Sequence, residues 1–68
     1  MAKDYQIDLP DVLAGPARRA LLQAGLRRLD QVKSLNEHEL LKLHGIGPRA
    51  IEQLRSALGD RGEGLAGD

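Results

Sequence analysis

The segment 44–49, His-Gly-Ile-Gly-Pro-Arg, contains the residues whose types and spacing best support a chemical function. Gly45 can adopt the left-handed conformation that ends a helix, and Gly47 has no Cβ, so another molecule can approach its backbone closely. Pro48 suits the first position of a following helix. The first amides of that helix have no partner within it, and with the positive helix end they form an anion site. The pattern therefore predicts noncovalent anion binding, assisted by the cation of Arg49.

The remaining parts of this site follow from the neighbouring residues. Ile46, between the two glycines, is expected to point inward and hold the two flanking helices together. His44 has two interpretations, a phosphate contact or a helix-end side chain that interacts with backbone carbonyls. Arg18 and Arg19 lie off the apolar stripe of an earlier helix, so they are further candidates for the same anion, although a solvated surface is the alternative. For an exposed site, the natural anion is a nucleic-acid phosphate.

Four helices are needed to position these residues, and apolar spacing predicts all of them. Ala17, Ala20 and Leu21 recur at helical spacing in the first, as do Ile51 and Leu54 in the last. Asn36 and Glu39 have the spacing of a capping box, which marks a helix start. The predicted helices are 16–24, 29–34, 37–43 and 48–58. The expected fold is an all-α, compact bundle of four to five short helices.

The two ends of the chain differ in composition from its middle. Residues 1–15 are predicted to form an N-terminal arm with a short turn of helix, and residues 16–58 the folded domain. Residues 59–68 contain four glycines and few apolar side chains, so we expect a disordered tail there.

Charge is also divided unevenly along the chain. The formal net charge is zero, which taken alone argues against a nucleic-acid ligand. Residues 16–58, however, contain eight basic and four acidic residues, a balance of +4, and the remaining residues carry −4. A basic middle between acidic ends is compatible with a basic contact surface.

The sequence around the two glycines resembles the helix-hairpin-helix family. Leu43, Gly45, Ile46 and Gly47 match the family's hairpin, as does Arg49 in the next turn. Segment 16–58 also resembles the C-terminal domain of the bacterial RNA polymerase α subunit, and residues 24–27 look like a degenerate copy of the hairpin. The resemblance implies contact between hairpin amides and DNA phosphates, largely independent of sequence. It also implies a fold like that of sterile-alpha-motif domains.

Other classes of function are less well supported by the sequence. A protein-interaction module is the main alternative, because domains of this fold also serve in docking and the net charge is zero. Ser34 and Ser56 lack a neighbouring base, and no carboxylate pair is placed for acid–base catalysis, so no enzyme activity is expected. There is no cysteine and only two histidines, so we expect no metal site and no cofactor. With no membrane-length apolar segment and no signal-like N-terminus, we expect a cytoplasmic protein. We also expect it to be a monomer.

Overall fold

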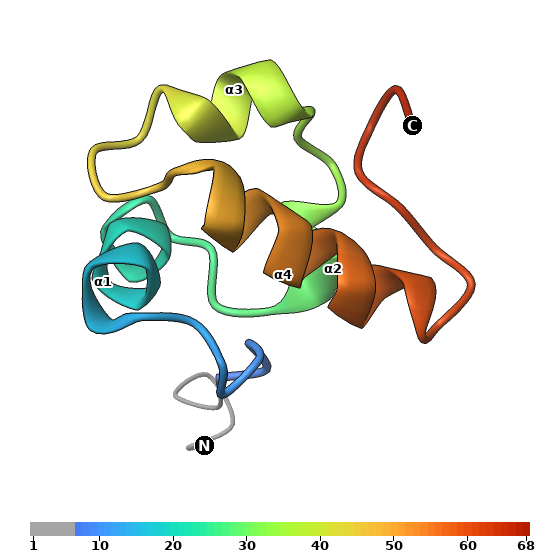
Figure 1. Ribbon diagram of the computed structural model, residues 1–68, viewed down its shortest axis with the longest axis horizontal. Helices are drawn as coiled ribbons and strands as arrows, with labels where there is room; N and C mark the ends of the chain where they lie inside the picture. The colour runs from blue at the N-terminus through green and yellow to red at the C-terminus, as the bar shows by residue number, and fades with distance from the viewer. Residues whose placement is uncertain (1–6) are drawn as a thin grey trace.

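The computed structural model describes residues 7–68, which form a small bundle of helices around one core (Figure 1). The helices in this range are α1 (Gly15–Gln23), α2 (Leu29–Val32), α3 (Glu37–Leu41) and α4 (Pro48–Gly59). No strand occurs within residues 7–68, although Asp8 and Arg28 form one isolated bridge. The prediction of a small all-α bundle is confirmed. The predicted termini agree within one residue for α1 and α4.

The two middle helices are shorter than the sequence predicts, by two residues each. After α2, the amides of Ser34 and Leu35 bond to carbonyls three residues back, and after α3 the amides of Lys42 and Leu43 do the same. The chain therefore leaves the α-helical pattern through tighter turns, which are common at helix ends. The predicted capping box is confirmed, because the Asn36 and Glu39 side chains each accept a backbone amide of the other residue, at 2.8 and 2.9 Å.

The core consists of aliphatic side chains from all four helices. The side chains that are fully buried are Leu21, Val32, Leu40, Ile51, Leu54 and Leu58. The longest helix, α4, crosses the middle of the bundle and contributes three of them (Figure 1). The Leu and Ile side chains of α4 pack inward against the rest of the core, whereas Glu52 and Ser56 on the same helix are exposed.

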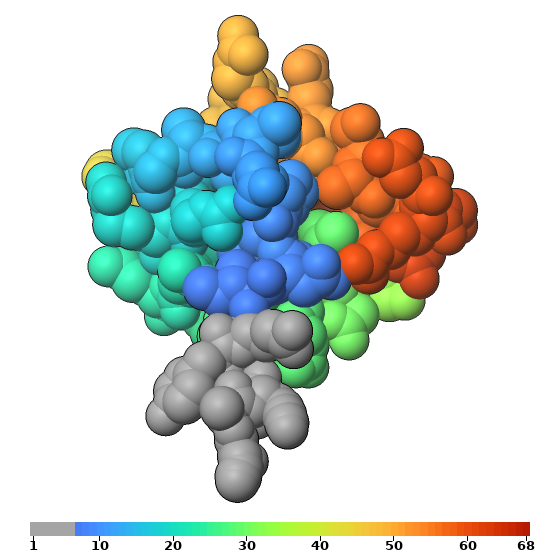
Figure 2. All heavy atoms as spheres, turned by 90° about the horizontal axis from the view of Figure 1, so that it is seen from below, coloured from blue at the N-terminus to red at the C-terminus, as the bar shows by residue number. Residues whose placement is uncertain are grey.

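The N-terminal arm belongs to the packed unit. Leu9 and Leu13 are buried in the core. The amide of Asp8 donates to the carbonyl of Arg27 at 2.8 Å, and the amide of Leu29 donates to the carbonyl of Asp8 at 3.1 Å. Figure 2 shows this segment, in blue, crossing the lower face between α1 and the C-terminal part of the chain. The folded domain is therefore larger than the predicted 16–58; residues 1–6 of the predicted arm lie outside the described range.

The C-terminal segment also differs from the predicted disordered tail. Leu65 is 3% exposed and packs into the core, and the amide of Ala66 donates to the carbonyl of Leu35 at 3.0 Å. Arg55 binds both carboxylate oxygens of Asp68, each at 3.0 Å, which anchors the end of the segment to α4. The glycine-rich composition gave no sign of the buried Leu65 side chain or of the three ion pairs that join this segment to the rest of the fold, which are Arg55–Asp68, Lys33–Glu63 and Arg61–Asp8.

Candidate nucleic-acid interface

The connection between α3 and α4 is held in place by Gly45 and Ile46. Gly45 has φ +106°, which confirms the predicted positive φ, but it does not end a helix, because α3 already ends at Leu41 with its C-cap at Lys42. A Cβ at this position would lie 2.7 Å from the carbonyl oxygen of Pro16 in α1. Ile46 is 7% exposed and buried in the core, which confirms that it points inward. Gly45 is thus required by the fold itself, because it lets the connection pass directly over α1.

Gly47, in contrast, has no internal reason to be glycine. Its φ of −124° is ordinary extended backbone, and a Cβ added to it would meet no atom within 4 Å. It occupies the N-cap of α4, a position at which Ser, Thr, Asp or Asn would bind the first helical amides. The open space beside Gly47 leaves this helix end accessible from outside.

The first turn of α4 has unpaired amides and no negative charge. Among the described residues, no acceptor is found for the amides of Gly47, Arg49 and Ala50. The first turn also has no acidic residue, and no side chain caps it. The side chain of Arg49 is exposed in that turn, where a cation opposes the helix dipole. An external anion would satisfy the amides and offset this unfavourable charge.

Two hollows lie on either side of Gly45. The first, of about 200 Å³, is bounded by Gly47, the first turn of α4, Gln53, and residues Ala14 and Ala17 at the start of α1. We call it the α4 hollow. The N-terminus of α1 also lacks a side-chain cap and an acidic first turn, so two positive helix ends meet there.

The second hollow has a volume of about 340 Å³ and lies between α1 and the connection that follows α3. Its lining residues are Pro16, Arg19, Ala20, Gln23, His44 and Gly45. We call it the α1 hollow. The contributions of Gln23 and Gln53 were not foreseen from the sequence, because they depend on how α1 and α4 approach Gly45.

The structure separates the two candidate arginines of α1. Arg19 is exposed and lines the α1 hollow together with His44, beside the connection to α4. The Nη2 atom of Arg18 instead donates to the carbonyl oxygen of Pro10 at 2.8 Å and lies 3.8 Å from Asp11. Arg18 therefore holds the N-terminal segment against α1. The predicted residues that the structure brings together are His44, Gly45, Gly47, Arg49 and Arg19.

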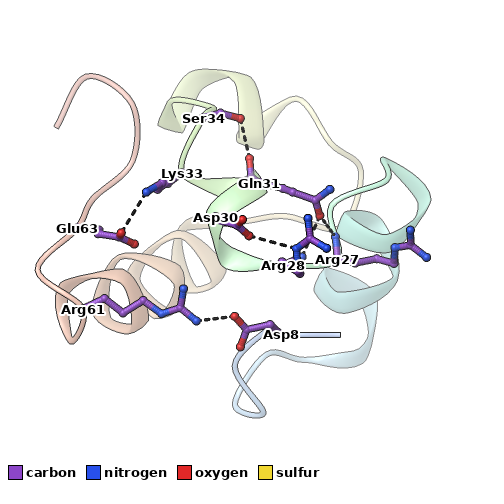
Figure 3. Close-up of polar contacts among 9 residues, drawn as sticks. All are labelled: Asp8, Arg27, Arg28, Asp30, Gln31, Lys33, Ser34, Arg61 and Glu63. Atoms are coloured by element: carbon purple, nitrogen blue, oxygen red, sulfur yellow. Dashed lines mark hydrogen bonds and ion pairs between the residues drawn. The ribbon is translucent and has the colours of Figure 1, made fainter. Parts of the chain in front are cut away.

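Ion pairs account for much of the remaining positive charge. Figure 3 shows Arg61 with Asp8, Arg28 with Asp30 and Lys33 with Glu63. The hydrogen bond that Arg61 donates to Asp8 raises the pKa of Arg61, and the bonds that Arg55 donates to Asp68 and Glu37 raise the pKa of Arg55. Within residues 7–68, the basic side chains that have no acidic partner within 4 Å are Arg19, Arg27, Lys42 and Arg49. The zero net charge thus coexists with unneutralised cations at both hollows.

The connection between α1 and α2, residues 24–27, differs from the α3–α4 connection in how its last backbone amides are bound. Gly25 has φ +81°, similar to Gly45, but the amides of Arg27 and Arg28 both donate to the side-chain oxygen of Gln31, at 2.8 and 3.0 Å (Figure 3). These amides are satisfied internally. Within residues 7–68, the connection into α2 therefore has its last two amides bound, whereas the connection into α4 ends at Gly47, whose amide has no acceptor.

No family model, no curated protein and no solved structure matches this chain. Within residues 7–68, no set of three His, Asp or Glu side chains converges that could hold a metal ion. No helix in the same range is long and apolar enough to cross a membrane.

Proposed function

We propose that this protein is a small DNA-binding protein that contacts the phosphate backbone through residues 44–50, which we call the hairpin. The observation that carries the proposal is the open N-terminus of α4, with three unpaired amides, no acid and an exposed arginine. Hydrogen bonds from backbone amides recognise phosphate oxygens and carry no base specificity. We therefore propose binding that is largely independent of sequence.

The fold supports this proposal because the backbone of the hairpin is anchored to the core while its amides stay unpaired. Gly45 passes over α1, and Ile46 is anchored in the core, so the amides at Gly47, Arg49 and Ala50 are held in position before any ligand arrives. Pre-organised donors avoid the entropy cost of ordering a loop on binding. Arg49 lines the α4 hollow and Arg19 lines the α1 hollow, so each hollow has one positively charged side chain.

The test is the charge reversal Arg49→Glu, with Arg27→Glu as the matched control. Both variants lower the net charge by two, and both residues are exposed and without an acidic partner among the described residues. Arg27 lines neither hollow. Arg49→Glu should stabilise α4 by about 0.3–1 kcal/mol, because an acid suits the first turn of a helix. It should nevertheless weaken binding to duplex DNA far more than Arg27→Glu does.

Salt dependence gives the same test a second measurement. Non-specific binding through few phosphates has a Kd of about 10⁻⁴ to 10⁻⁶ M at physiological salt, so titrations belong at low salt. Losing one phosphate contact should lower the slope of log affinity against log salt by about 0.9. Amide shift changes on adding DNA should centre on residues 44–50.

Other results would point away from DNA. Equal losses for Arg49→Glu and Arg27→Glu would indicate a diffuse charge effect and no hairpin site. If no amide moves at millimolar DNA in low salt, the alternative of a protein-interaction module is preferred. The exposed apolar side chains of Ile7, Val12 and Leu41, which are 44%, 65% and 39% exposed, would then be the first positions to test.

A further inference from the structure

The α1 hollow combines three polar side chains that suit a phosphate group. Arg19 is a permanent cation, Gln23 offers an amide donor, and His44 has an imidazole that can carry a positive charge. All three belong to two segments, α1 and the end of the α3 connection, that only the fold brings together. This hollow is separate from the amides of α4, although Gly45 borders both.

Within residues 7–68, no carboxylate oxygen lies within 4 Å of the His44 imidazole nitrogens, and no acidic residue lines the hollows beside it. Arg19, His44 and Arg49 are the only charged or titratable residues that line the two hollows. A third, smaller hollow beside His44 is lined by Ala20, Gln23, Ala24 and Leu43, which are uncharged. The side chain of Glu39, the nearest acid in the preceding helix, accepts the amide of Asn36. His44 and Arg19 therefore line one hollow that has no acidic lining residue, and an anion bound there would be favoured by Arg19 and by a protonated His44.

We propose that the α1 hollow binds a second phosphate of the nucleic-acid strand, and that it does so with His44 protonated. The inference rests on the proposed function, because the strand is the one held at the α4 hollow. A backbone that passes over Gly45 presents phosphates to both hollows. The amides of α4 supply donors at any pH, whereas His44 supplies its charge only when it holds a proton. Binding of DNA then takes up a proton at His44.

The direction of the pH dependence follows from this coupling. Histidine ordinarily changes charge between pH 5 and 8. Because the DNA-bound state favours protonated His44, affinity is greatest at low pH and is lost as the pH rises. The gain is about tenfold for each unit by which the bound phosphate shifts the protonation equilibrium. One added phosphate contact should also steepen the slope of log affinity against log salt by about 0.9 at pH 5.5 relative to pH 8.

The chain contains two histidines, which provides a matched control. Duplex DNA is titrated at constant salt between pH 5.5 and 8 with the parent, His44→Gln and His38→Gln. His38 is exposed on α3 and lines none of the three hollows. The parent and His38→Gln should bind more tightly as the pH falls. His44→Gln should lose most of this increase.

Failure of this inference can be told apart from failure of the proposed function by including Arg49→Glu at pH 8. If the parent binds at pH 8 through Arg49 but its affinity does not change with pH, the proton-linked hollow is refuted and the hairpin site stands. The same holds if His44→Gln keeps the parent's pH dependence, or if His38→Gln abolishes it. If DNA binds at no pH, both proposals are wrong.

Discussion

Substitution of Gly47 separates the effect of the hairpin on stability from its effect on binding. The residue is the N-cap of α4, its backbone is extended, and a Cβ added there would meet no atom within 4 Å. Gly47→Ser should therefore fold and gain a few tenths of a kcal/mol, because Ser is a better N-cap than Gly. Gly47→Val should fold but lose roughly 0.5–1.5 kcal/mol, because Val is much less favourable than Gly at the N-cap position.

Binding should respond in the same direction in both variants. The hydroxyl of Gly47→Ser would accept the amide of Arg49 or Ala50, and so compete with the phosphate for it. A hydrogen bond to a charged group contributes about 1.5–3 kcal/mol, so the loss of one corresponds to a roughly 10- to 150-fold weaker affinity. In Gly47→Val the branched side chain would block the approach of the phosphate. Urea unfolding measures the stability, and titration with duplex DNA at low salt measures the binding.

The neighbouring glycine serves as the contrasting case. Gly45→Ala should lose about 1–3 kcal/mol from backbone conformation alone, whether or not DNA is a ligand. Its Cβ would also lie 2.7 Å from the carbonyl oxygen of Pro16, so α1 would have to shift. A more stable Gly47→Ser variant that binds DNA as tightly as the parent would show that the α4 amides do not hold phosphate. A Gly47→Ser variant less stable than the parent would show that a serine at this position does not cap α4.

Two further predictions concern the C-terminal segment. Leu65→Ala should lower the unfolding free energy by about 2–5 kcal/mol in urea titrations, because Leu65 is 3% exposed; a loss no larger than that of Leu41→Ala, at a side chain 39% exposed, would contradict its burial. The hydrogen bonds from Arg55 lower the pKa of Asp68 below its ordinary 3.8. The Arg55–Asp68 pair therefore stabilises the fold above pH 3.8, and this stabilisation is lost as the pH falls through the lowered pKa of Asp68. Hydrogen exchange at the amide of Ala66 should become faster over that acid range in the parent, and an identical acid dependence in Asp68→Asn would refute the link.

The sequence by itself determined the helices and the turn at the candidate site. Helical spacing of Ala, Leu and Ile places the four helices, because a period of 3.6 residues puts their apolar side chains on one face. The capping box at Asn36 was predictable as well, since it depends on contacts within a few residues, and the positive φ of Gly45 was predicted from its residue type. The unpaired amides of the hairpin also depend only on residues that are close together in the sequence.

Contacts between distant segments were decided only by the tertiary structure. Arg18 and Arg19 are adjacent and chemically identical, yet the carbonyl of Pro10 binds one and leaves the other beside His44. Leu65 is a single apolar residue among glycines, and its burial depends on a site that α4 and its neighbours create. Local patterns cannot report such outcomes, because the free energy of burial or ion pairing comes from atoms that are far away in the sequence and near only after folding.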